Sequence, residues 1–155
     1  MRNSVESIAA GLVLGVVGML AGIWTPGPQQ AGAAESDPEA DRAALKRDLQ
    51  IVRSQIELYK IQHLDKDPSG APGVGLDGEK FIQQLINKTD QRGVIGAGDL
   101  GPYLDRFPKN PFVDGGKGDK LKIVIGPCPG DGTTGWYFDV KTGKLSPNDP
   151  ENKGM

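Results

Sequence analysis

The sequence predicts an α+β fold in which a long amphipathic helix packs on a small antiparallel sheet, behind an N-terminal membrane helix. Three observations predict it. Residues 8–24 carry no charge, residues 38–64 place apolar side chains at helical spacing, and the chain after residue 120 holds short β-forming runs between glycine-rich turns. A chain of 155 residues has room for one small domain and a terminal segment.

Residues 1–24 are expected to form a transmembrane or signal-anchor helix. The stretch Ile8–Trp24 has seventeen residues without a charge. As a helix it would be about 26 Å long, which is enough to cross a thin bilayer. A removed secretory signal is the alternative, since Arg2 gives a positive start and Ala31-Gly32-Ala33 resembles a cleavage site. Under either interpretation the rest of the chain is exported.

Residues 25–37 form a Pro/Gly/Ala-rich linker, and a long helix is expected from Pro38 to about Leu64. Asp37 is its predicted N-cap, because its side chain can accept from the free N–H groups of the first turn. The helix face expected to pack on the core consists of Leu45, Leu49, Val52, Ile56, Tyr59 and His63. A second, narrower stripe consists of Ile51, Leu58 and Ile61. It indicates either a contact surface, as in an assembly, or ordinary surface apolar residues.

The rest of the exported domain, placed at residues 38–147, is expected to hold a short helix and three strands. Asp77 is the predicted cap of the short helix, whose inner face consists of Phe81, Ile82, Leu85 and Ile86. The predicted strands are residues 121–125, 135–140 and 144–146, with a hairpin turn over 141–143. Residues 148–155 are predicted to be a polar, frayed tail.

Composition excludes several classes of function. The 18 Lys and Arg and 20 Asp and Glu residues interleave, and the net charge is −2, so we expect no nucleic-acid partner. Glycine and proline make up close to a quarter of the chain, which favours loops over long regular structure. A single cysteine, Cys128, excludes an intramolecular disulfide, and a single histidine, His63, excludes a His-pair metal site.

No arrangement of residues indicates an active site. His63 is predicted to be packed on the helix, and Cys128 to be an unreactive loop thiol. Residues 96–101 match G-x-G-x-x-G, but no buried strand and crossover helix flank them, so the match is attributed to chance. Asp131 and Asp139 lack the alternating carboxylates of a calcium loop. We therefore expect no enzyme activity, catalytic residue, cofactor or metal.

Three stretches together resemble a known family. Residues 48–63 (DLQIVRSQIELYKIQH), 101–115 (GPYLDRFPKNPFVDG) and 135–145 (GWYFDVKTGKL) resemble a type II secretion pseudopilin of the major type, in the type IV pilin-like superfamily. The resemblance implies a pilin-like fold and a structural role in protein transport. Such a subunit is a single-pass inner-membrane protein with its C-terminal domain in the periplasm. It assembles with itself, other pseudopilins and further components of the secretion machinery.

The resemblance also implies a role for Glu6. In the family a glutamate opens the apolar helix, a glycine follows nine residues later, and Glu6 and Gly15 keep this spacing. The family's glutamate pairs with the N-terminal amine of a neighbouring subunit, which offsets the cost of a charge in lipid. Residues 1–5 lack the Gly-Phe processing site of the family. Uncut, pilin-type and signal-peptide maturation therefore all remain open.

A second function hypothesis is a binding module without catalytic activity, either membrane-tethered or secreted into the periplasm. Its contact surface would be formed by the aromatic side chains Tyr103, Trp136 and Tyr137. Packing of these aromatic residues in the core is the alternative to this interpretation.

Overall fold

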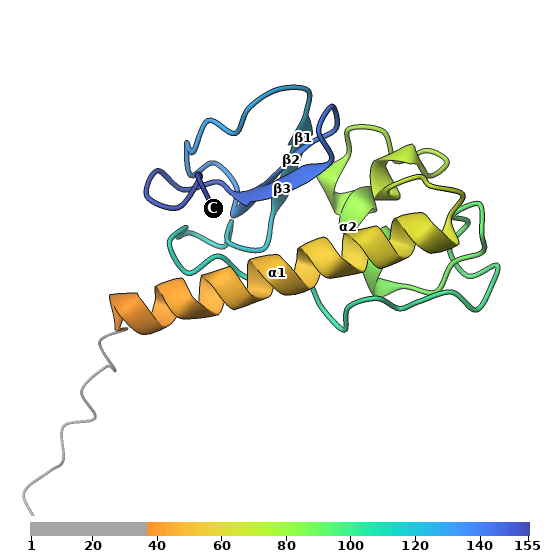
Figure 1. Cartoon of the computed structure of the whole chain (residues 1–155), viewed down its shortest axis with the longest axis horizontal. Coiled ribbons are helices and arrows are strands. Elements are labelled where there is room, and N and C mark those ends of the chain that lie inside the picture. Colours follow the sequence, from red (N-terminus) through yellow and green to blue (C-terminus); the bar gives the residue numbers. More distant parts are fainter. Residues whose placement is uncertain (1–36) are drawn as a thin grey trace, which may run out of the picture. The chain divides into compact units, whose positions relative to one another are not determined.

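The computed structural model describes residues 37–155, in which helices and a three-stranded sheet pack together (Figure 1). The predicted membrane helix of residues 1–24, the linker up to residue 36 and Glu6 lie outside the described residues. The elements in chain order are α1 (Pro38–Gln62), the 3₁₀ turn η1 (Pro68–Gly70), α2 (Gly78–Ile86), β1 (Leu121–Val124), β2 (Trp136–Asp139) and β3 (Lys144–Pro147).

Helix α1 begins as the sequence predicts and ends two residues earlier. The Asp37 side chain accepts from the Glu39 N–H at 3.0 Å, and Pro38 occupies the first helical position. Leu64 and Asp65 both have positive φ, and the Asp65 N–H donates to the Lys60 carbonyl at 2.9 Å. This is the geometry of a left-handed C-terminal cap, which closes the helix before the expected end at Leu64.

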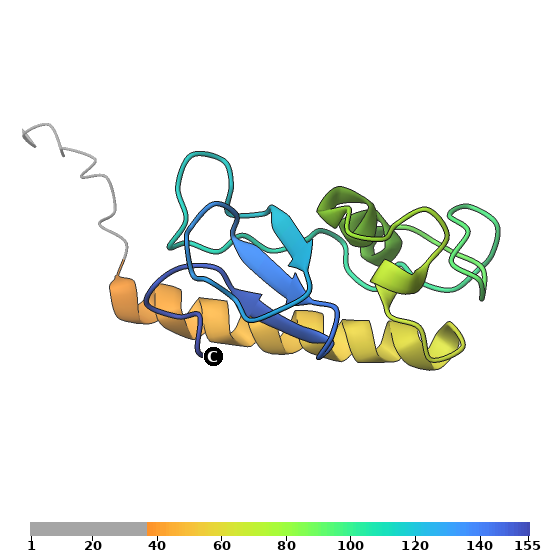
Figure 2. The same cartoon turned by 90° about the horizontal axis from the view of Figure 1, so that it is seen from above.

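The core face of α1 is confirmed. Both views place the sheet and α2 on the same side of α1 (Figures 1 and 2). Phe81 of α2 and Phe138 of β2 meet with ring centroids 4.7 Å apart. The apolar residues of α1 that are almost fully buried against these elements are Leu45, Leu49, Val52, Ile56 and Tyr59. Burial of this one face is the main apolar contribution of α1 to stability.

The sheet is mixed, so the prediction of an antiparallel sheet is wrong for one of its two pairs. The strand order is β1-β2-β3; β2 pairs antiparallel with β3, but β1 pairs parallel with β2, with Leu121 opposite Trp136. Residues 125–135 connect β1 to β2 and carry the chain back to the start of β1. A connection of this length permits the parallel pair, whereas a short hairpin would not.

The polar tail is packed, which corrects the prediction that residues 148–155 fray. Asn148, Asp149 and Asn152 are at most 2% exposed. The Asn148 N–H donates to the Gly135 carbonyl at 3.0 Å, and its carbonyl accepts from the Gly132 N–H at 2.7 Å. The tail is polar because it satisfies the backbone of the irregular connector, whose N–H and C=O groups have few partners in regular structure.

Candidate functional site

An apolar stripe on the outer side of α1 is the first feature of the candidate site. Ile51, Leu58 and Ile61, called here the outer stripe, are 45%, 40% and 79% exposed. They lie on α1 away from the core face, and Leu64, just past the helix end, is 60% exposed. The second stripe predicted from the sequence is therefore present at the surface. An exposed row of large aliphatic side chains is a feature of surfaces that bind other proteins.

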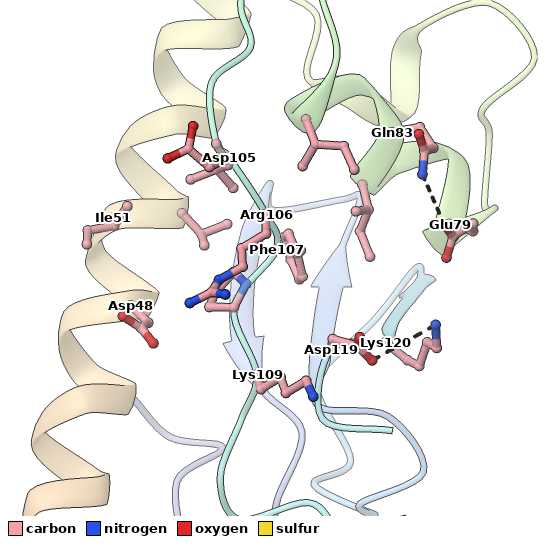
Figure 3. A pocket seen from close by; sticks show the side chains of 15 residues that line it. Asp48, Ile51, Glu79, Gln83, Asp105, Arg106, Phe107, Lys109, Asp119 and Lys120 are labelled. Atoms are coloured by element: carbon pink, nitrogen blue, oxygen red, sulfur yellow. Dashed lines mark hydrogen bonds and ion pairs between the residues drawn. The ribbon is translucent and has the colours of Figure 1, made fainter. Parts of the chain in front are cut away.

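A groove next to this stripe is the second feature. It has a volume of about 790 Å³ and lies between α1, α2 and residues 104–109 (Figure 3). Ile51 belongs to both the outer stripe and the groove, so the two features are continuous. The other apolar residues in its lining include Ile86 of α2 and Leu104.

Residues 101–109 are held in place from both sides, which gives the groove its shape. The Tyr103 and Leu104 N–H groups both donate to the Leu85 carbonyl at the end of α2, at 2.8 and 3.0 Å. The Trp136 indole N–H donates to the Pro108 carbonyl at 2.8 Å, and Phe107 meets the Trp136 ring edge-on. Because these anchors come from α2 and β2, the segment forms a fixed wall of the groove.

Charged side chains surround the mouth of the groove. Asp105 and Arg106 are both exposed, and neither forms an ion pair with another residue of the described part of the chain. Lys120 lies 3.9 Å from Asp119, and Glu79 accepts from Gln83 at 3.1 Å (Figure 3). Both signs of charge are therefore present at the mouth, and part of the charge is available to a partner.

His63 is packed, as the sequence predicts, and both ring nitrogens are used. Its ring stacks on Tyr59 with centroids 3.6 Å apart. Nδ1 lies 2.8 Å from the Tyr59 carbonyl, which can only accept, so Nδ1 carries the proton and donates. Nε2 lies 2.9 Å from the Thr89 hydroxyl oxygen, within hydrogen-bond distance. Both ring nitrogens therefore form hydrogen bonds within the fold, and His63 helps to hold the domain together.

The Cys128 thiol is partly buried and contacts the backbone. Its Sγ lies 3.3 Å from the Pro147 carbonyl, and burial raises the pKa of the thiol. A raised pKa leaves little thiolate, the reactive form, at neutral pH. The position supports the prediction of an unreactive loop thiol.

Asp131 and Asp139, the two carboxylates considered as calcium ligands, each form hydrogen bonds within a different turn. Asp131 Oδ1 accepts from the Thr133 hydroxyl at 2.7 Å and from the Asn148 amide at 2.8 Å. Asp139 Oδ1 accepts from the Gly126 and Lys141 N–H groups, both at 3.0 Å. These bonds lower the pKa of both carboxyl groups. Within residues 37–155, no three His, Cys, Asp or Glu side chains come together so as to hold a metal ion.

The aromatic side chains considered as a contact surface lie in the core. Trp136 is fully buried, and Tyr137 and Tyr103 are 4% and 9% exposed. Tyr103 donates its hydroxyl proton to Gln62 Oε1 at 2.6 Å, which ties the groove wall to the end of α1. Tyr103 and Trp136 hold the groove wall in place, Tyr137 donates to the Gly126 carbonyl of the β1–β2 connector, and the three side chains do not form an exposed binding face.

Comparisons with known proteins were made at three levels: family models, curated proteins and solved structures. No protein-family model matches the chain, and neither a curated protein nor a solved structure matches it. Neither α1 nor α2, the two helices of the described part, is both long and apolar enough to span a bilayer. Sequence reasoning found the outer stripe from its spacing. It missed the groove, because the walls come from segments up to about seventy positions apart and no local pattern marks them.

Proposed function

We propose that this chain is a structural subunit of a type II secretion pseudopilus or a related pilin-like filament. Residues 1–24 would anchor it in the inner membrane, and the domain that follows the linker would lie in the periplasm. The subunit would act mechanically in protein export, by assembling with copies of itself and with other pseudopilins, without turnover of a substrate.

The family follows from the sequence resemblance, and one structural observation supports a role in assembly: α1 has an apolar face on each of two sides. Leu45, Leu49 and Val52 are buried against the rest of the domain, while Ile51, Leu58 and Ile61 remain exposed along the same helix. A helix that served only its own domain would need a single apolar face. The exposed residues therefore support a second packing partner, as a subunit of an assembly requires.

The test compares the full chain with residues 35–155, which form a compact unit with a core of their own. We expect the full chain to form oligomers in lipid vesicles and the shortened chain to sediment as a monomer. Glu6→Ala in the full chain should leave the circular dichroism spectrum unchanged and reduce the oligomer fraction, because Glu6 would pair with a neighbouring amine. A full chain that remains monomeric in vesicles would contradict the proposal, and normal assembly of the variant would contradict the role of Glu6.

The groove favours a second candidate function, the periplasmic binding module. Its volume of about 790 Å³ lies in the range of small-molecule and peptide sites. A binding module would keep its full ligand affinity as the monomeric 35–155 chain. An assembly subunit without residues 1–24 would keep its contact surfaces but lose the membrane that brings the copies together, so its oligomers would dissociate and the same shortened chain distinguishes the two functions.

A further inference from the structure

We propose that the groove of one copy receives the C-terminal end of α1 from a second copy. The inserted part, called here the knob, consists of Leu58, Ile61 and Leu64. This inference rests on the proposed function and names the surfaces through which the subunits would meet.

Both the knob and the groove present large aliphatic side chains. The knob exposes three large aliphatic side chains, of which Ile61 at 79% is the most exposed. The groove offers Ile51, Ile86 and Leu104 as part of its lining. Insertion would remove both sets of apolar side chains from water, which is favourable. An α-helix in an apolar groove is a common mode of protein recognition.

The charges beside the two surfaces are complementary. Asp65 and Lys66 follow the knob, and Asp105 and Arg106 lie at the mouth of the groove. All four side chains are exposed, and none forms an ion pair with another residue between 37 and 155. Asp65 of one copy can therefore pair with Arg106 of the next, and Lys66 with Asp105. Complementary charges of this kind select the partner and its register.

The knob and the groove lie at different places on the chain, which decides the type of assembly. A contact between two different surfaces is heterologous, so each copy keeps one free knob or one free groove for the next copy. Along α1, the knob centres on Ile61, and the groove is lined by Asp48, Ile51 and Val52, about ten residues earlier. In a stack with parallel α1 axes, each copy would be displaced by about 15 Å along the axis. Repeating this displacement with the α1 axes parallel yields an open filament, because a ring or a two-fold dimer about an axis parallel to α1 would keep all copies at one height.

The first test is cross-linking between full-length copies in lipid vesicles, in a Cys128→Ser background. Copies with Ile61→Cys and copies with Lys109→Cys are mixed and oxidised. We expect a disulfide between positions 61 and 109, and no 61–61 or 109–109 product. Ile125→Cys replaces Ile61→Cys in the matched control, because Ile125 is 71% exposed but lies outside both surfaces. A 61–61 product, or oligomers that give no 61–109 product, would overturn the inference.

The second test is a double-mutant cycle on the oligomer fraction of the full chain. Asp65→Asn and Arg106→Gln should each weaken assembly about two- to five-fold, as expected for the loss of an exposed ion pair. Asn suits position 65 because it tolerates the positive φ of Asp65. The double variant should be no weaker than either single variant, because both remove the same pair. Additive losses would contradict the pairing.

The outcomes separate the two proposals. If the unmodified chain forms no oligomers in vesicles, the proposed function and the knob-in-groove contact both fail. If it forms oligomers that Ile61→Asp weakens no more than the control Ile125→Asp, only the knob-in-groove contact fails.

Discussion

His63 lies at the end of α1, where the last four carbonyl groups of the helix have no partner within the helix. Its Nδ1 satisfies the Tyr59 carbonyl, and its Nε2 meets the hydroxyl of Thr89 across the core. The imidazole thus joins the helix end to the loop after α2. A buried histidine with both ring nitrogens bonded in this way stabilises the fold.

Replacing His63 by Phe tests this role. The ring can still stack on Tyr59, but the Tyr59 carbonyl and the Thr89 hydroxyl lose their partner. We expect the free energy of unfolding to fall by about 1–3 kcal/mol, the cost of unsatisfied buried polar groups. Urea denaturation of residues 35–155 measures it. Ile61→Ala, two residues earlier and exposed, is the control and should change stability by less than about 0.5 kcal/mol. An unchanged His63→Phe midpoint would contradict the role.

Asp131 gives the domain a dependence on pH. Hydrogen bonds, first among them that from the Thr133 hydroxyl, hold the pKa of Asp131 below its ordinary value. A carboxyl whose pKa is lower in the folded state stabilises the fold above its unfolded pKa, about 4, and loses this effect as the pH falls. Asp131→Asn should therefore lower the urea midpoint at pH 7. As the pH is lowered from 5 to 2.5, the midpoint of this variant should decrease less than that of the unmodified chain. Asp99→Asn, at a side chain 99% exposed, should follow the unmodified chain at every pH.

At the scale of elements, the two sides of α1 have separate tasks. Leu49 is 2% exposed and packs on the core, whereas Leu58 on the outer stripe is 40% exposed. Both are leucines in the same helix, so their truncation compares the two faces directly.

Leu49→Ala should lower the free energy of unfolding of residues 35–155 by about 2–5 kcal/mol, because it leaves a cavity in the core. Leu58→Ala should cost that shortened chain less than about 1 kcal/mol but reduce the oligomer fraction of the full chain. Urea denaturation and sedimentation in vesicles measure the two effects. Equal loss of stability in both variants would show that the outer stripe serves the domain's own fold.

The elements that depend on local pattern follow the sequence prediction. The core face of α1, the Asp77 cap of α2 and the β2–β3 hairpin all match, because helical spacing, capping and hairpin turns act over a few residues. The Asp77 side chain accepts from the Glu79 and Lys80 N–H groups at 3.0 and 3.1 Å, as an N-cap should. The direction of β1 relative to β2 was not predicted correctly, because it depends on the path of the connector between the two strands.

At the scale of the whole molecule, the C-terminal residues close the domain onto α1. The Arg53 guanidinium donates to the Leu145 carbonyl of β3 at 2.6 Å and to the Met155 carbonyl at 2.9 Å. Arg42 donates to Asn152 Oδ1 at 3.3 Å. These contacts join residues about a hundred positions apart, so the tail is part of the fold that presents the groove and the outer stripe.

The sequence by itself determined the α+β class, the extent of α1 within two residues and its two apolar faces. It also carries the resemblance on which the proposed function depends. These properties follow from residue type and spacing, which act locally. Only the tertiary structure decided the parallel β1–β2 pair, the packed tail and the groove between α1, α2 and residues 104–109. Each of these depends on contacts between distant segments, and chain connectivity and burial select such contacts without leaving a local pattern in the sequence.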